Sequence, residues 1–418
     1  MKKPELLAPA GDLEKLKVAF AYGADAVYAG GSAFGLRAYA GNLDLEELKV
    51  GVKYTHDLGK KIYVTVNIFA HEDDFDNLPE YIKYLEEVGV DAIIVSDPGI
   101  VKLAVEIAPL LPVHLSTQAN STNSNSINFW LEQGVQRVIL ARELTKEELK
   151  QIRPKVNGEI ELFVHGAMCM SYSGRCLLSN YLTGRDANKG ECTQPCRWGY
   201  GIVEQKRPGE VFPLEEDSRG TYIFNSHDLC LLPYLPALKE VNIESWKIEG
   251  RMKSPHYVAS TVKVYREAID TLWDKGEEEY RAKIPAWLEE MDKVSHRNYS
   301  AGFFFGKPGA DAHNIESSDY IREYNFVGRV LEEERCKNTA ECGFWIEQRN
   351  YFKKGDILEV LSPDQEPWSF QVEKMWDEDG VEVDVARHAM KEIKLDLPRK
   401  LEPFSIIRKP RKLEESGF

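Results

Sequence analysis

Four cysteines lie close together in the middle of the chain: Cys169, Cys176, Cys192 and Cys196. Gaps of six, fifteen and three residues separate them. Such a gathering of thiolates is typical of a bound metal or iron-sulfur cluster, because a soft cation offsets the cost of holding them together. Structural zinc sites favour ligand pairs about two to four residues apart, and only the last pair fits. The longer loops favour a 4Fe-4S cluster, with zinc as the alternative and a structural thiol cluster as a third interpretation.

The remaining three of the seven cysteines, Cys230, Cys336 and Cys342, lie outside this stretch. An odd count argues against a disulfide framework. Cys230 follows a polar turn and is a candidate fifth ligand, although a cysteine beside leucines is more often a small buried hydrophobic residue. The other two stand among charged residues, and we assign them no role.

Polar side chains recur where predicted strands end, which is where parallel sheets and barrels place their active sites. His165 lies four residues before Cys169 and is the candidate for proton transfer. Some polar residues could instead cap helices, as Asp97 before Pro98 would. The strand-end residues predicted to bind substrate are Asn67, Gln118, Arg142, Lys247, Glu249 and Arg251.

A repeated pattern supplies the elements that would position these residues. An amphipathic segment ends at a glycine, and an apolar run follows after two or three residues, as at Gly23, Gly59, Gly89 and Gly134. Glycine suits the left-handed residue that ends a helix, and the apolar run suits a strand buried on both faces. A fifth copy has Asn242 in place of glycine, and asparagine also tolerates that conformation.

The five copies and the further apolar runs at 5–8, 113–117 and 160–164 give eight strands, with residues 222–224 as a possible ninth. Eight βα units predict a TIM-type (βα)8 barrel, and a doubly wound open sheet is the alternative. We assign the barrel to residues 1–320, with the cysteine segment as an insertion at 166–200. From about residue 321 to 418 the pattern changes to short β-like runs with tight turns, which predicts a small all-β barrel domain. A helical bridge is expected over 277–296.

Net charge limits the partners that the chain can bind. The formal charge of -15 weakens any general nucleic-acid affinity, because phosphate binding needs clustered Lys and Arg. Local basic surfaces are predicted at 408–412 and, more weakly, at Lys247, Arg251 and Lys253. The first residues form no signal peptide, and no apolar stretch is long enough to span a membrane, so we expect a cytoplasmic protein.

The cysteine segment is also the clearest family signature. The runs HGAMCMSYSGRCLLS at 165–179, RDANKGEC at 185–192 and PCRW at 195–198 resemble the collagenase-like peptidase family, number 32 of unknown catalytic type. The run KIEGRMKS at 247–254 is similar to its second signature, and PELLAPAG at 4–11 also matches. The resemblance covers nearly the whole chain.

Within that family the chain is most similar to the proteins of tRNA hydroxylation. The resemblance implies a tRNA-modifying enzyme that 5-hydroxylates the wobble uridine in a prephenate-dependent reaction. It implies that Cys169, Cys176, Cys192 and Cys196 hold an iron-sulfur cluster. Related members act in oxygen-independent ubiquinone hydroxylation, and the complete C-terminal β domain favours the tRNA branch.

Prephenate has two carboxylates, for which arginine is the best bidentate partner. From their positions in the chain, Arg37, Arg142 and Arg251 are predicted to bind these anions, although each could instead form a structural ion pair. The β domain with its basic tail is a candidate to hold the anticodon stem.

Two other functional classes compete with the hydroxylase. One is the protease of the family's name, but the chain lacks a zinc-protease helix motif, since His71-Glu72 is followed by no matching histidine. Four clustered cysteines also suit ligation better than a single nucleophile. The other class is a non-catalytic RNA-binding scaffold with a structural metal.

Overall fold

A computed structural model describes most of the chain. The described residues are 2–31, 34, 42–168, 177–185, 192–193, 195, 201–203, 211–213, 227–306, 320–332 and 344–411. Arg37, Cys169, Cys176 and Cys196 therefore lie outside the described residues, as do Cys336, Cys342 and the possible ninth strand at 222–224.

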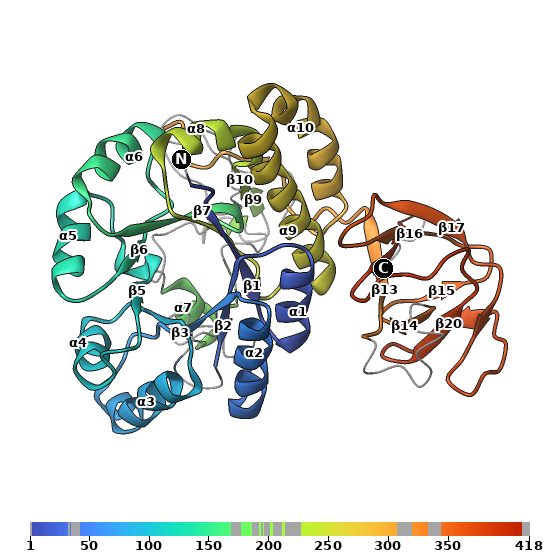
Figure 1. Ribbon diagram of the computed structural model, residues 1–418, viewed down its shortest axis with the longest axis horizontal. Coiled ribbons are helices and arrows are strands. Elements are labelled where there is room, and N and C mark those ends of the chain that lie inside the picture. Colours follow the sequence, from blue (N-terminus) through green and yellow to red (C-terminus); the bar gives the residue numbers. More distant parts are fainter. Residues whose placement is uncertain are drawn as a thin grey trace.

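Eight parallel strands form a closed barrel (Figure 1). Each strand pairs with the next, and the last pairs with both the first and the seventh, which closes the ring. The TIM-type prediction is therefore confirmed, and the open-sheet alternative is wrong. The strands are β1 (Glu5–Ala10), β2 (Ala26–Gly30), β3 (Lys61–Val66), β4 (Ala92–Val95), β5 (Val113–Leu115), β6 (Arg137–Ile139), β7 (Glu159–Gly166) and β11 (Ser245–Ile248).

Helices cover the outside of this barrel. Gly89 ends α3 with φ 85°, and Asn242 ends α8 with φ 62°, so both predicted helix-ending residues are left-handed. The described barrel helices are α1 (Leu13–Ala21), α2 (Leu45–Asp57), α3 (Leu78–Val88), α4 (Pro98–Ile107), α5 (Ser124–Glu132), α6 (Lys146–Ile152), α8 (Leu235–Val241), α9 (Pro255–Asp270) and α10 (Glu277–Asp292). The predicted bridge over 277–296 corresponds largely to α10. Among the described residues no helix has the length and apolar character needed to cross a membrane.

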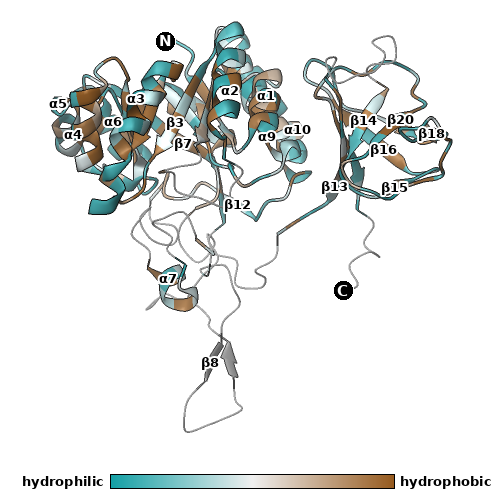
Figure 2. Ribbon diagram, turned by 90° about the horizontal axis from the view of Figure 1, so that it is seen from below, coloured by the Kyte–Doolittle hydropathy of each residue, from teal (hydrophilic) through white to brown (hydrophobic). Residues whose placement is uncertain are grey.

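The chain between β7 and α8 contains several short elements. Its elements are α7 (Leu178–Thr183), the β8 (Gly201–Val203) and β9 (Val211–Pro213) hairpin, and β10 (Asp228–Cys230), which pairs antiparallel with β7. β12 (Tyr299–Ser300) pairs with β10. Figure 2 shows α7 on the side of the barrel opposite the N-terminus, which is the side where the parallel strands end.

The C-terminal residues form an antiparallel half-barrel sheet, so the all-β prediction is confirmed. Its seven strands follow the order β17-β16-β21-β13-β14-β20-β18, and β15 and β19 form a separate ribbon. The bounds are β13 (Tyr324–Val330), β14 (Trp345–Gln348), β15 (Phe352–Lys353), β16 (Ile357–Leu361), β17 (Trp368–Gln371), β18 (Met375–Trp376), β19 (Val385–Ala386), β20 (Glu392–Leu395) and β21 (Ile406–Pro410).

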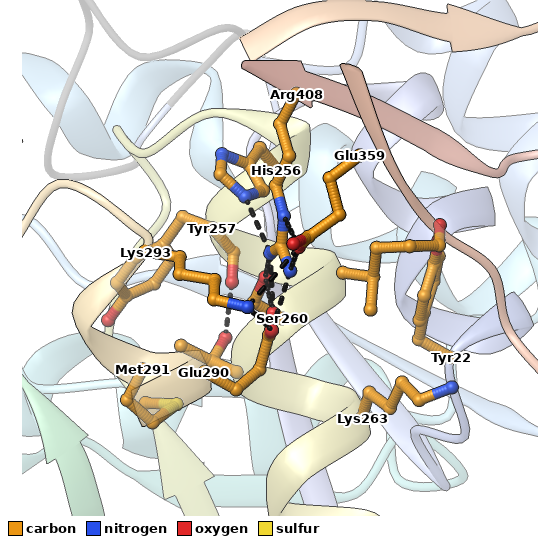
Figure 3. A network of polar contacts seen from close by, with 12 residues as sticks. Tyr22, His256, Tyr257, Ser260, Lys263, Glu290, Met291, Lys293, Glu359 and Arg408 are labelled. Carbon is orange, nitrogen blue, oxygen red and sulfur yellow. Dashed lines mark hydrogen bonds and ion pairs between the residues drawn. The ribbon is translucent and has the colours of Figure 1, made fainter. Parts of the chain in front are cut away.

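A buried arginine joins this sheet to the barrel (Figure 3). Arg408 of β21 is fully buried and donates to Glu290 of α10 at 2.5 and 2.6 Å and to Glu359 of β16 at 2.8 Å. Lys263 of α9 donates to three backbone carbonyls of residues 362, 363 and 365 at 2.8 to 2.9 Å. Leu361 and Ile406 also belong to the apolar core of the barrel. The two parts are thus held by both charge and apolar contact.

The burial of Arg408 corrects the predicted basic surface at 408–412 in part, since Arg411 is exposed and Lys412 lies outside the described residues. Lys409 is also engaged, since its Nζ lies 2.9 Å from Asp356 Oδ2. β21 pairs with β13 on one side and with β16 on the other, so Arg408 and Lys409 lie within the sheet. The weaker surface is also wrong, because Lys247 and Arg251 are buried.

Candidate active site at the barrel mouth

Predicted site residues meet pairwise across the ends of the strands. Asn67, just after β3, donates to Gln118, just after β5, at 2.5 Å. Arg142, after β6, donates to Glu249, after β11, at 3.2 Å. Arg251 reaches in the opposite direction, to Thr65 Oγ1 of β3 at 3.0 Å. Side chains from four different strands are thereby linked into a polar rim around the barrel mouth.

Arg142 connects this rim to the segment that carries the cysteines. Its Nη1 donates to the carbonyl of Ala167 at 2.6 Å, and Ala167 precedes Cys169 by two residues. The guanidinium lies 4.0 Å from the ring centroid of Phe163, and the side chain is almost buried. A planar donor that bonds on one edge and stacks on a ring is held in one orientation. The exit of β7 is therefore fixed to Glu249.

Gly166 shows how closely this exit passes the rim. Its φ is 110°, a conformation that side chains of L-residues rarely adopt. A Cβ there would lie 2.5 Å from the backbone oxygen of Glu249. The segment leading to Cys169 thus needs glycine for both conformation and space.

Buried charges alternate below the rim, inside the barrel. Lys247 donates to Glu161 at 2.8 Å, Glu161 lies 3.3 Å from Arg137, and Arg137 donates to Glu5 at 2.5 Å. Burial would raise the pKa of Glu5, but Arg137 lowers it below its ordinary value. Lys247 also lies 4.2 Å from the ring centroid of Tyr28. These alternating charges hold the cation of Lys247 in the barrel interior, beneath the mouth.

Two buried donors at the rim have no hydrogen-bond partner among the described residues: Gln118 Nε2 and Arg142 Nε. Gln118 is oriented by its oxygen, which accepts from Asn67 and from Ser116 Oγ at 3.2 Å. Its NH2 group is consequently left to donate elsewhere. A buried unsatisfied donor is costly, so these two groups are suited to an acceptor brought by a ligand, such as a carboxylate.

His165 is buried within a group of aromatic rings. The ring centroids of Tyr257 and Tyr265 of α9 and Tyr299 of β12 lie 5.4 to 6.0 Å from its own. Burial lowers the pKa of His165 to about 3, so the imidazole is neutral near pH 7. The imidazole contacts these tyrosines, whereas the side chains of Arg142 and Glu249 contact each other. The catalytic role of His165 stays a prediction.

The hydrogen bonds of Tyr265 fix which imidazole nitrogen carries the proton. The Tyr265 hydroxyl donates to the carbonyl of Val164 at 2.9 Å and lies 3.4 Å from His165 Nδ1. Because the hydroxyl has one proton, Nδ1 must be the donor in the second contact. The lone pair of His165 is therefore on Nε2, which has no partner among the described residues.

The described residues include two cysteines with different surroundings. Cys192 is an exposed thiol, and the next residue, Thr193, donates from its backbone to Ser179 Oγ of α7 at 3.1 Å. Cys230 is buried, and burial raises the pKa of its thiol to about 11. Burial and a raised pKa favour the interpretation of Cys230 as a hydrophobic residue over that of a fifth ligand.

The chemistry of the donor set fits a thiolate-bound metal group. Four soft sulfur donors follow the exit of β7, and the first comes directly after the segment held by Arg142. Within the part of the chain that the structure describes, no three His, Cys, Asp or Glu side chains gather as a metal site. The ligand assignment of Cys169, Cys176, Cys192 and Cys196 remains a prediction.

Sequence reasoning missed several residues that build the site. Glu161 and Arg137 carry the interior charges, and Thr65 and Asn42 receive the two Nη donors of Arg251 at 3.0 and 2.7 Å. Glu161 had a usable signal, since a charged residue inside an apolar strand must face a partner. Asn42 had none, because it lies in a loop after β2. Arg37, predicted to bind anions, lies outside the described residues.

Comparison with known proteins gives consistent matches over the whole chain. The model of peptidase family U32 matches residues 11–314, and that of the peptidase family U32 C-terminal domain matches 322–408. A tRNA hydroxylation protein P1 from Bacillus subtilis is 44% identical over 98% of this chain and 95% of its own length. A tRNA hydroxylation protein P from Escherichia coli is 38% identical over 96% of this chain and 95% of its own.

A third relative acts on a different RNA according to its name. The 23S rRNA 5-hydroxycytidine C2501 synthase of Escherichia coli is 34% identical over 76% of this chain and 47% of its own length. The names of these three relatives all refer to RNA hydroxylation, although the relatives differ in length and in the RNA that their names give.

Proposed function

The chain belongs to peptidase family U32, and we propose that it hydroxylates tRNA. The specific reaction is 5-hydroxylation of the wobble uridine with prephenate as co-substrate and a 4Fe-4S cluster on Cys169, Cys176, Cys192 and Cys196. Relatives named for tRNA hydroxylation, matched over nearly their full length, support the tRNA substrate. The name of the rRNA relative supports hydroxylation of a pyrimidine at its 5-position.

The unpartnered donors of the rim carry the co-substrate part of the proposal. Prephenate offers carboxylate acceptors, and Gln118 Nε2 and Arg142 Nε are buried donors without an acceptor among the described residues. Lys247 adds a cation in the barrel interior. In this arrangement Arg142 would orient the ligand beside the segment that leads to Cys169.

The remaining residues have roles that follow from their surroundings. When bound, the cluster would supply the redox or Lewis-acid chemistry that amino-acid side chains lack. His165 keeps the proposed role in proton transfer through the lone pair on Nε2, although a pKa of about 3 makes it a weak base near pH 7. Asn67 and Glu249 would position Gln118 and Arg142. We further propose that the protein works in the cytoplasm and that the C-terminal domain holds the anticodon stem.

Nucleoside mass spectrometry of tRNA tests the function. A deletion strain should lose 5-hydroxyuridine derivatives, and the wild-type gene should restore them. Gln118→Leu should restore them poorly, because one donor to the carboxylate is lost, whereas Lys102→Met, at an exposed ion pair of the barrel helix α4, should restore them fully. Unchanged tRNA in the deletion strain would refute the proposal.

A second measurement addresses the cofactor and the competing peptidase. Anaerobically purified protein should contain about four iron and four sulfide per chain, as a cubane requires. A colourless protein with one zinc would refute the cluster. Gelatin cleavage that is lost in Cys169→Ala would favour the peptidase, and no such cleavage is expected.

A further inference from the structure

The short helix α7 exposes most of its apolar side chains. Tyr181 is 85% exposed, Leu177 is 67% exposed and Leu182 is 42% exposed, whereas Ser179 is buried. Six residues are too few for a helix to be stable in water by itself. Something other than its own apolar packing therefore holds α7 in place.

Hydrogen bonds attach α7 to the cysteine segment. Thr193 donates from its backbone to Ser179 Oγ at 3.1 Å, and the two hydroxyls lie 3.1 Å apart. Thr193 directly follows Cys192, one of the four predicted cluster ligands. The exposed face is consequently tied to the metal-binding segment, and it lies on the mouth side of the barrel (Figure 2).

Tyr181 differs from the other exposed aromatic residues of the described barrel domain. Phe129 and Phe305 are also exposed, but Phe129 contacts Trp130 with centroids 5.4 Å apart, and Phe305 contacts Tyr234 at 4.8 Å. Tyr181 has no ring contact among the described residues. Its phenol ring is therefore open to a planar partner on the side where substrate must approach.

We propose that α7 is an RNA-docking element on which Tyr181 stacks a base of the single-stranded anticodon loop. This inference rests on the proposed function. Leu177 and Leu182 would flank the base. Stacking suits this chain because its net charge of -15 gives little general attraction for RNA.

The size of the exposed face favours RNA over a protein partner. One tyrosine and two leucines on a six-residue helix offer far less than the roughly 800 Å² per partner that a stable protein interface buries. A single ring, in contrast, is a complete platform for one unpaired base. The wobble base lies in such an unpaired loop.

Binding of a fluorescent anticodon stem-loop RNA to the anaerobically purified, iron-loaded full chain tests the proposal. Tyr181→Ala should weaken binding about 5- to 150-fold, the range for one lost stacking contact. Tyr181→Trp should keep the affinity, because it keeps the ring. Phe129→Ala, at an exposed ring of the barrel helix α5, is the control and should bind as the wild type does.

Salt dependence and iron content distinguish the outcomes. Tyr181→Ala should leave the slope of affinity against salt unchanged, because stacking releases no counterions. Failure of the wild-type protein to bind the hairpin would overturn the proposed function itself. Normal RNA binding by Tyr181→Ala would overturn this inference alone. So would a loss of iron in Tyr181→Ala that Tyr181→Trp does not restore. Altered self-association of Tyr181→Ala with unchanged RNA affinity would also overturn it.

Discussion

Replacing Arg408 with methionine should uncouple the C-terminal domain from the barrel. Methionine keeps most of the apolar stem and removes the guanidinium that bridges Glu290 and Glu359 (Figure 3). Burial lowers the pKa of Arg408, but the two carboxylates more than offset this and raise it. The residue is therefore charged at every working pH, and its loss leaves two carboxylates without their shared cation.

The cost can be worked from the exposure of the partners. Removing one member of a buried ion pair costs about 3 to 5 kcal/mol, because the other charge is left buried. Glu290 and Glu359 are 12% and 15% exposed, and Lys293 lies 3.6 and 3.3 Å from them. The remaining lysine offsets part of the loss. We expect about 3 kcal/mol, the lower end of that range.

Urea unfolding followed by tryptophan fluorescence measures this coupling. The wild type should unfold in one transition, whereas Arg408→Met should show an earlier transition of one part. Adding Glu290→Gln to Arg408→Met should recover some stability, because a buried charge is removed. Lys391→Met breaks an exposed pair and should change stability by less than about 1 kcal/mol. A single transition with an unchanged midpoint in Arg408→Met would refute the reasoning.

Two further predictions concern acid stability and the exit of β7. Burial lowers the pKa of His114, His165 and His256. These side chains are neutral when folded and take up protons when unfolded below about pH 6.5, so stability should fall by about 3 to 4 kcal/mol from pH 6 to pH 5. Urea midpoints that stay constant over this range would contradict it. Gly166→Ala should cost more than about 2 kcal/mol and reduce iron content, because its Cβ would meet the Glu249 backbone. Gly59→Ala, left-handed but in open space, should cost only about 1 kcal/mol in thermal unfolding and retain its iron.

The sequence predicts the barrel well because its signal is repeated. Each glycine or asparagine that ends a helix is followed by an apolar run, and β2, β3, β4, β6 and β11 all follow that rule. Closure could not be predicted in this way. It depends on the pairing of β11 with both β1 and β7, and the residues paired there are more than 80 positions apart along the chain. Their contact is a property of packing that no local pattern records.

Strand-end positions predict well which residues lie at the barrel mouth. They predict less well the direction in which each side chain points. The rule predicts that these residues converge on one mouth, and in the structure Asn67 contacts Gln118 and Arg142 contacts Glu249. The ion pair of Arg142 is the structural alternative that the sequence left open. His165 obeys the same rule but contacts tyrosines of α9 and β12. The pairing register shifts beside it, between Lys247 and Ile248, and such an irregularity re-aims a side chain. Strict alternation along β7 cannot anticipate that shift.

The prediction that Arg408 belongs to a basic surface was wrong for a related reason. A change of composition near residue 320 marks where one sequence pattern ends, but packing does not end there, since Leu361 and Ile406 belong to the apolar core of the barrel. Arg408 contacts His256 of α9 at 3.2 Å, and the next residue, Tyr257, donates to the Glu249 carbonyl at 2.8 Å. One helix thus contacts both the domain junction and the mouth. A charged residue that seems to end the chain is therefore part of the framework that holds the site.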